Sequence, residues 1–121
     1  MTSTLRVLII EDNAVIAADI HRIVESAYPA TAAYARSFAE AVTITDSLAA
    51  FDLAIVNPPL HIDASNAALL RVAQACSAMV VCSAAPISLT GTPLEDAEFI
   101  LKPFADEDLL KTCRRALSGT S

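Results

Sequence analysis

Residues 5–13 read LRVLIIEDN, and this stretch decides the fold. The apolar run over residues 5–10 has the length of one buried strand, and the acidic pair Glu11-Asp12 ends it. Residues 13–26 follow with apolar side chains at the spacing of one helix face, namely Ile16, Ile20, Ile23 and Val24. The chain therefore begins with a predicted strand, an acidic strand end and a helix, in that order.

The same strand-then-helix order recurs through the rest of the chain. Residues 84–97, AAPISLTGTPLEDA, interrupt it, because two prolines and one glycine stand where a helix is expected. That helix is predicted to be short, displaced or absent. Regular alternation of strands with helices is typical of a parallel sheet that helices cover on both faces. The later predicted strands are residues 31–35, 52–56, 79–82 and 98–101, and the later predicted helices are residues 37–48, 64–76 and 105–117.

Length and charge exclude several classes of protein. A chain of 121 residues, 55% of them hydrophobic, has the size of one domain, so residues 1–121 are expected to form a single folded unit. Its formal net charge of −6 repels a phosphate backbone, which disfavours nucleic acid and anionic membrane as partners. No apolar stretch approaches the roughly 20 residues of a membrane-spanning helix. Acids follow the first apolar run too early for a signal peptide, so the expected location is the cytoplasm.

Glycine and cysteine usage narrows the chemistry further. The glycines are Gly91 and Gly119, which excludes the glycine-rich phosphate loops of nucleotide-binding enzymes. The cysteines Cys76, Cys82 and Cys113 lack close pairing and lie in apolar-rich segments. Their placement indicates buried, reduced thiols rather than a metal or redox centre.

Polar residues follow four of the five predicted strands. The strand 31–35 ends without an obvious reactive group. Because the carboxyl ends of parallel strands meet at one edge of a sheet, the polar residues after the other strands are expected to lie together. Carboxylate and carbonyl oxygens suit Mg²⁺, and an ammonium with a hydroxyl suits phosphoryl oxygens, so the set indicates phosphate chemistry. Its members are Glu11-Asp12, Asn57, Ser83 and Lys102-Pro103.

Four segments, in this order along the chain, resemble the response-regulator receiver domain of bacterial two-component signalling. They are VLIIEDN from residue 7, DLAIVNPPL from residue 52, VVCSA from residue 80 and FILKPF from residue 99. The resemblance covers essentially the whole chain. It implies a flavodoxin-like fold with strand order 2-1-3-4-5 and a signalling role that is not enzymatic. It also implies a sensor histidine kinase, another signalling protein or a second copy of the chain as partner.

The resemblance further implies a role for each strand-end residue. The Lys102-Pro103 peptide bond is expected to be cis, and no catalytic residue is implied. Asp12 is the more direct of the acidic ligands. The implied Mg²⁺ ligands are Glu11, Asp12, Asn57 and the Pro59 carbonyl, and the implied phosphate and switch residues are Ser83, Lys102 and the aromatic Phe99.

Asn57 departs from the family, whose phosphoacceptor at this position is an aspartate. A carboxylate oxygen can attack a phosphoryl group and form an acyl phosphate, whereas the oxygen of a neutral amide is a poor nucleophile. Loss of this negative charge also weakens Mg²⁺ binding, because Glu11 and Asp12 are then the only acids of the site. The chain is therefore predicted to be a pseudo-receiver that acts through protein–protein contacts, with no phosphorylation at Asn57 and with Mg²⁺ binding weak or absent.

Two other interpretations stay open. Asn57 is either native or an engineered substitution that inactivates an ordinary phosphoaccepting response regulator, and the sequence does not separate these. Alternatively, the chain is a small-ligand-binding α/β domain that shares only the architecture, since a fold does not fix a function. A hydrolase of this architecture would need a positioned base, and Ser83 has no histidine at a suitable spacing.

Overall fold

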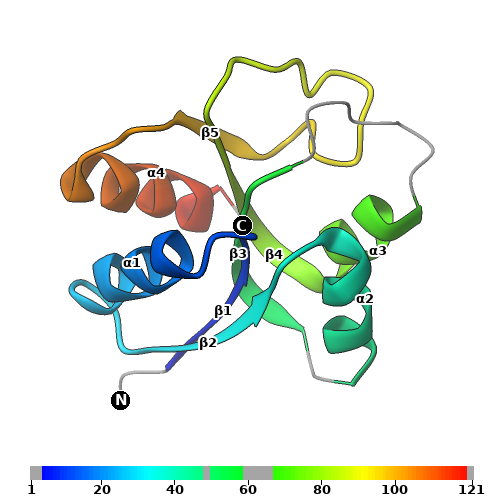
Figure 1. Ribbon diagram of the computed structural model, residues 1–121, viewed down its shortest axis with the longest axis horizontal. Coiled ribbons are helices and arrows are strands. Elements are labelled where there is room, and N and C mark those ends of the chain that lie inside the picture. The colour runs from blue at the N-terminus through cyan, green and yellow to red at the C-terminus, as the bar shows by residue number, and fades with distance from the viewer. Residues whose placement is uncertain (1–3, 48–49, 59–66, 120–121) are drawn as a thin grey trace.

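The computed structural model describes residues 4–47, 50–58 and 67–119, which form a five-stranded sheet with helices on both sides (Figure 1). The strands lie in the order β2-β1-β3-β4-β5, and every neighbouring pair is parallel. The predicted flavodoxin-like fold class, with strand order 2-1-3-4-5, is confirmed. The elements are β1 (Leu5–Ile10), α1 (Ala14–Glu25), β2 (Ala30–Ala35), α2 (Phe38–Ser47), β3 (Phe51–Val56), α3 (Ala67–Ala75), β4 (Cys76–Ser83), β5 (Glu98–Leu101) and α4 (Asp106–Ser118).

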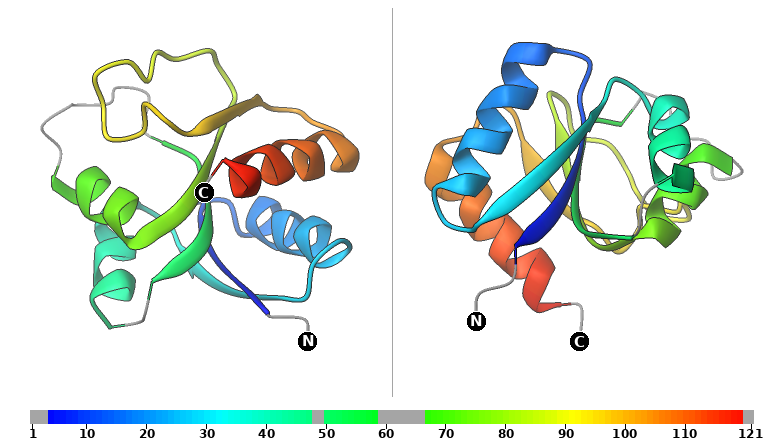
Figure 2. Two further views of the ribbon diagram at one scale, coloured as in Figure 1. Left: turned by 180° about the vertical axis from the view of Figure 1, so that it is seen from behind. Right: turned by 90° about the horizontal axis from the view of Figure 1, so that it is seen from below.

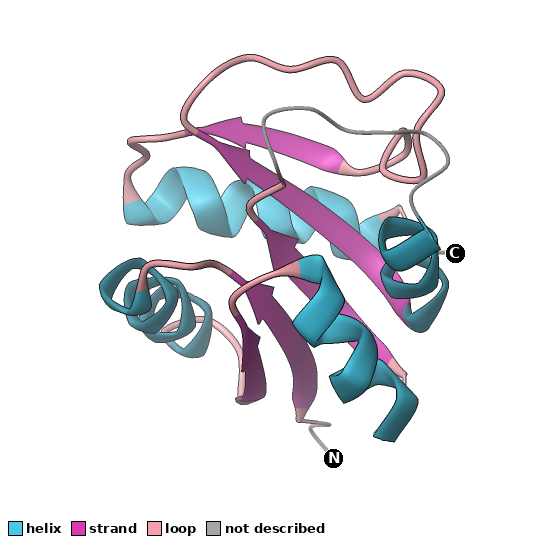
Figure 3. Ribbon diagram, turned by 45° about the vertical axis from the view of Figure 1, so that its right-hand side comes forward, coloured by secondary structure: helices cyan, strands magenta, loops and turns pink. Residues whose placement is uncertain are grey.

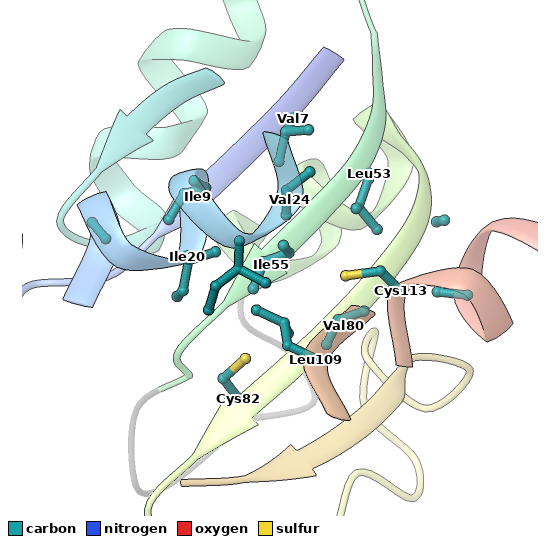
Figure 4. Close-up of a cluster of buried hydrophobic side chains, with 14 residues drawn as sticks. Val7, Ile9, Ile20, Val24, Leu53, Ile55, Val80, Cys82, Leu109 and Cys113 are labelled. Carbon is teal, nitrogen blue, oxygen red and sulfur yellow. The ribbon is translucent and has the colours of Figure 1, made fainter. Parts of the chain in front are cut away.

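The helices α1 and α4 lie on one face of the sheet, and α2 and α3 lie on the other, as Figures 1 and 2 show. Successive residues of a strand point to opposite faces. Val7 and Ile9 of β1 accordingly join the core under α1 and α4, which Figure 4 shows in close-up. Leu8 and Ile10 join the second core, under α2 and α3. None of the described helices is long and apolar enough to cross a membrane.

The central strands β1 and β3 are apolar on both faces because both faces are covered. Residues 7–10 and 53–56 are each at most 1% exposed. Full burial of one large aliphatic side chain contributes about 1.5–3 kcal/mol, so these strands anchor the fold. The continuous apolar runs that predicted the two strands follow from this position in the sheet.

The cap of α1 fixes the turn between β1 and the first helix. The Asn13 side-chain oxygen accepts hydrogen bonds from the amides of Val15 at 3.0 Å and Ile16 at 3.2 Å. These two donors would otherwise lack partners at the start of a helix. The cap therefore sets where the chain leaves β1, and with it the place of the acidic pair Glu11-Asp12.

Residues 84–97, all of which the structure describes, contain no helix. Pro86 and Pro93 cannot donate a backbone hydrogen bond, and Gly91 has a φ of 76°, which other residues rarely adopt. Figure 3 shows the segment as a long loop between β4 and β5. The prediction of a short, displaced or absent helix is confirmed, and in this structure the helix is absent. Apolar side chains of the loop pack into the core under α2 and α3: Ile87, Leu89 and Leu94.

The boundary between α3 and β4 differs from the prediction. The sequence predicted a helix over residues 64–76 and a strand over residues 79–82, but α3 ends at Ala75 and β4 begins at Cys76. Small apolar residues here suit a helix and a strand equally, and pairing of Cys76 with Phe51 of β3 decides for the strand. Residues 64–66 of the predicted helix lie outside the described residues.

Candidate functional site

Four strands bring their carboxyl ends to one edge of the sheet. The amide of Asn57 donates to the carbonyl of Ile10 at 2.8 Å, which holds the end of β3 beside the end of β1. The amide of Lys102 donates to the carbonyl of Ser83 at 2.8 Å, which holds the end of β5 beside the end of β4. These four strand ends form the carboxyl edge of the sheet.

A buried ion pair joins the two outermost of these ends. Lys102 Nζ lies 2.6 Å from Glu11 Oε1, and the side chains are 17% and 2% exposed, respectively. The second carboxylate oxygen of Glu11 accepts a hydrogen bond from the Asn13 amide at 3.0 Å. Both oxygens of this carboxylate are therefore engaged within the protein. Hydrogen bonds between ionised groups are about twice as strong as neutral ones, and here they tie β1 to the residue after β5.

Removing one partner of such a pair is costly. A buried charge that loses its counterion is left without water and without compensation, which typically costs about 3–5 kcal/mol. The Glu11–Lys102 pair is thus a structural tie across the carboxyl edge. The structure places both residues at the predicted edge, while their roles toward metal and phosphate stay predictions.

A hollow of about 270 Å³ at the carboxyl edge brings Asp12 and Asn57 together with Arg36. Arg36 directly follows β2, so it corrects our expectation that this strand ends without a reactive group. The signal was present in the sequence, because Arg36 occupies the same strand-end position as the other polar residues. It brings a positive charge to a hollow that otherwise contains one carboxylate, and Phe38, Pro58 and Leu69 form its apolar lining.

Ser83 is engaged in a local turn. Its hydroxyl donates to the Ala85 carbonyl at 2.7 Å and accepts from the Ala85 amide at 3.2 Å. The side chain is thereby used to start the loop that follows β4. Phe99, the other predicted switch residue, lies half-buried in β5 and packs against the core under α2 and α3. The peptide bond between Lys102 and Pro103 is cis, as the resemblance implied.

Burial lowers the reactivity of the three cysteine thiols. Cys82, next to Ser83, has its pKa raised to about 12, mainly by burial, and nearby Lys102 offsets part of this effect. Burial likewise raises the pKa of Cys76 and of Cys113 to about 12. Cys82 and Cys113 are buried and Cys76 is half-buried. Because the thiolate is the reactive form, these groups are poor nucleophiles at neutral pH.

The carboxyl edge offers Mg²⁺ little free anionic oxygen. Mg²⁺ takes oxygen ligands in near-octahedral geometry, usually several waters together with one or two carboxylates. Glu11 has both oxygens engaged, Asn57 is neutral, and Asp12 shares its hollow with the cation Arg36. Within residues 4–47, 50–58 and 67–119 no group of three or more His, Cys, Asp or Glu could hold a metal ion. The predicted ligand Pro59 lies outside the described residues.

Comparison with known proteins shows that the backbone of this chain is similar to that of several solved structures. Neither a protein-family model nor a curated protein sequence matches the chain. A receiver domain protein from Methanospirillum hungatei is 18% identical, with a TM-score of 0.71 and coverage of 95% of both chains. A response regulator receiver protein from Sinorhizobium medicae is 18% identical, with a TM-score of 0.75 and coverage of 98% of both chains.

An orphan response regulator of H. pylori is 21% identical to the chain, with a TM-score of 0.70, and the match covers 97% of this chain and 99% of that one. At identities this low the likeness concerns the backbone and leaves function to the site. The likeness nevertheless covers 95% or more of this chain in each of these three comparisons. The chain therefore has the fold of CheY-like response-regulator receiver domains.

Proposed function

We propose that this chain is a single receiver-like signalling domain that acts through protein–protein contacts and does not carry a phosphoryl group at residue 57. The observation that supports this most is the state of Lys102, whose ammonium is bound to Glu11 at 2.6 Å. To reach a phosphoryl group on residue 57, Lys102 would have to leave the buried carboxylate of Glu11, and another cation would then have to compensate that carboxylate. Breaking the pair without replacement is costly.

The chemistry of Asn57 supports the same proposal. Its amide nitrogen has a delocalised lone pair and its oxygen is a weak nucleophile, so transfer from a phosphohistidine has no acceptor. The neighbouring hollow contains the cation of Arg36 beside the carboxylate of Asp12. Two charges of opposite sign reduce the attraction of this hollow for Mg²⁺, so metal binding is expected to be weak or absent.

The partners follow from the same proposal. A domain of this kind would contact a sensor histidine kinase, another signalling protein or a second copy of itself. Val15, at the start of α1 beside the carboxyl edge, is 79% exposed and offers an apolar contact to such a protein. With a formal net charge of −6, nucleic acid and anionic membrane are not proposed as partners. The proposed location is the cytoplasm, and no catalytic activity is assigned.

Intact-mass analysis after incubation with acetyl phosphate and Mg²⁺ tests the proposal. The unaltered chain is expected to gain no phosphoryl group, while the matched variant Asn57→Asp is expected to gain one and to bind Mg²⁺ more tightly in titration. A stoichiometric gain on the peptide that contains Asn57 in the unaltered chain would overturn the proposal. An unmodified Asn57→Asp variant would show that the other site residues have also lost phosphotransfer.

The natural codon at position 57 separates the two origins of the asparagine. An asparagine codon supports a native pseudo-receiver. An aspartate codon would make the natural chain a phosphoaccepting response regulator, and the proposal would then hold for the substituted chain alone.

A further inference from the structure

β4 begins four residues before the first residue that pairs with β5. β4 pairs with β3 from Cys76 onward, but it pairs with β5 only from Val80 onward. Residues 76–79 of β4 therefore have a neighbouring strand on one side only, and we call this stretch the free edge. An unpaired strand edge presents backbone donors and acceptors to which another extended chain can bind.

The direction of the free backbone groups follows from the other end of β4. The Ser83 carbonyl accepts from the amide of Lys102, so Ser83 directs its backbone groups toward β5. Backbone direction alternates along a strand, so Met79 and Ser77 direct theirs to the same side. Within the part of the chain that the structure describes, no hydrogen bond reaches the backbone of Ser77 or the Met79 amide from that side. The free edge thus offers at least two amide donors and one carbonyl acceptor.

A groove of about 300 Å³ runs along the free edge. Residues 76–79 of β4 form one wall, Leu94 and Asp96 lie on the segment that precedes β5, and Arg115 belongs to the end of α4. Leu94 and Asp96 belong to the loop between β4 and β5 that replaces a helix. A strand advances about 3.3 Å per residue, so the free edge matches a short extended segment of roughly four residues.

The charged groups that line the groove indicate which kind of extended segment it would bind. Arg115 is paired with Glu98 at 2.9 Å, so its positive charge is balanced. Asp96 is exposed and, among the described residues, has no ion pair or hydrogen bond. The balance of these three groups is one negative charge, and the chain as a whole carries −6. A segment with a basic side chain is therefore favoured over an acidic one.

We propose that the groove binds an extended segment of a partner protein by addition of a strand to β4, with a Lys or Arg of that segment beside Asp96. Backbone hydrogen bonds to Ser77 and Met79 would supply the affinity, and Asp96 would supply the preference for charge. The groove lies at the amino end of the sheet, opposite the carboxyl edge. The proposal is therefore independent of the chemistry at Asn57.

Selection of a random heptapeptide library displayed on phage against the full chain tests the proposal. Enriched peptides are expected to alternate β-branched residues with others and to contain Lys or Arg. In spectra of the ¹⁵N-labelled chain, synthetic copies should shift the amide signals of Ser77 and Met79. Asp96→Lys should shift the selection toward peptides that contain Asp or Glu.

Proline substitution tests the backbone contact. Ser77→Pro removes an amide proton that has no partner in the free chain and should weaken peptide binding at least tenfold. Ser88→Pro, at an exposed loop serine outside the groove, is the matched control and should leave binding unchanged. If Ser77→Pro does not fold, the backbone contact is tested on the peptide instead. N-methylation of the peptide amides should then abolish binding.

The proposal is overturned if no enriched peptide shifts the Ser77 and Met79 signals. It is also overturned if binding survives Ser77→Pro in a variant that keeps its melting temperature, or survives N-methylation of every peptide amide. Selection of acidic peptides by the unaltered chain would contradict the assigned charge preference.

Discussion

The two ends of β4 differ in how their polar groups are satisfied. At the carboxyl end, the Ser83 hydroxyl and carbonyl both have partners, and Lys102 beside it is bound to Glu11. At the amino end, the amides of Ser77 and Met79 face a groove without a partner among the described residues. One end is closed by its own residues and the other is open to an added chain.

This difference bears on where the domain can bind a partner. A closed, internally paired site gains little from a ligand, because each new contact must replace an existing one. Backbone groups that are already exposed to water at a groove carry a smaller cost of exchange. The open end is therefore a better candidate for strand addition than the carboxyl end, where Glu11 and Lys102 are already paired.

The largest expected loss of stability comes from removing the ion pair at the carboxyl end of β4. Lys102→Met should lower the free energy of unfolding by about 3–5 kcal/mol, because Glu11 remains buried without its counterion. Urea denaturation measures the loss. Lys111→Met, at an exposed lysine of α4, is the matched control and should change stability by less than about 0.5 kcal/mol.

Adding Glu11→Gln to the Lys102→Met variant should restore most of the lost stability, because the unpaired charge is removed. A loss below about 1 kcal/mol in the single variant would mean that the pair is weak and the carboxyl end is not closed.

The next effect comes from the wall of the open end. Leu94 is 1% exposed and lines the groove while it packs under the α2–α3 face. Leu94→Ala should cost about 2–4 kcal/mol in denaturation, since it leaves a cavity in the core. Leu101→Ala, at a leucine that is 47% exposed, should cost less than about 1 kcal/mol. Equal costs for the two variants would show that the loop does not share the core.

The sequence predicts the fold well because the central strands are buried on both faces. The run at residues 7–10 is apolar at every position, which suits a strand in the middle of a covered sheet, and the strand order follows from the resemblance. The start of β4 could not be predicted, since Cys76 suits both states and only its pairing with Phe51 decides. Local pattern is therefore sufficient for strongly apolar strands and insufficient for small residues.

The candidate site is predictable in its location and less so in its contacts. Strand-end positions predict that Glu11 and Lys102 share an edge, and the structure shows their ion pair. The turn that occupies the Ser83 hydroxyl depends on how the following loop leaves the sheet, which no local pattern specifies. Arg36 could have been found by applying the strand-end rule to the weak strand β2 as well.

A smaller loss of stability tests whether the cap of α1 acts independently of the Glu11–Lys102 ion pair. Asn13 caps the helix with its side chain and supports Glu11 with its backbone amide. Asn13→Ala keeps the amide and removes the cap, so it should cost about 1 kcal/mol, whereas Asn13→Asp should cost less. Thermal unfolding of the two variants checks this. A cost for Asn13→Ala near that of Lys102→Met would mean that the cap and the pair form one unit.

The cysteines near the two ends of β4 have the smallest expected effect on stability, because they change it only at high pH. Burial raises the pKa of Cys76 and of Cys82 from 9.0 to about 12. Well below pH 9 these thiols are neutral in the folded and unfolded states alike, so they add no pH dependence there. As pH rises from about 9 to 12 the unfolded chain ionises first, and stability should fall.

Labelling with iodoacetamide compares the two ends directly. Cys76 is half-buried in the open groove, whereas Cys82 is buried beside the closed site. Peptide mapping should find Cys76 modified first, at a rate that rises with pH because the thiolate reacts. A groove-binding peptide should slow the modification of Cys76 and leave that of Cys82 unchanged. If Cys82 were modified first, the carboxyl end would be the more open one and the contrast between the two ends would be reversed.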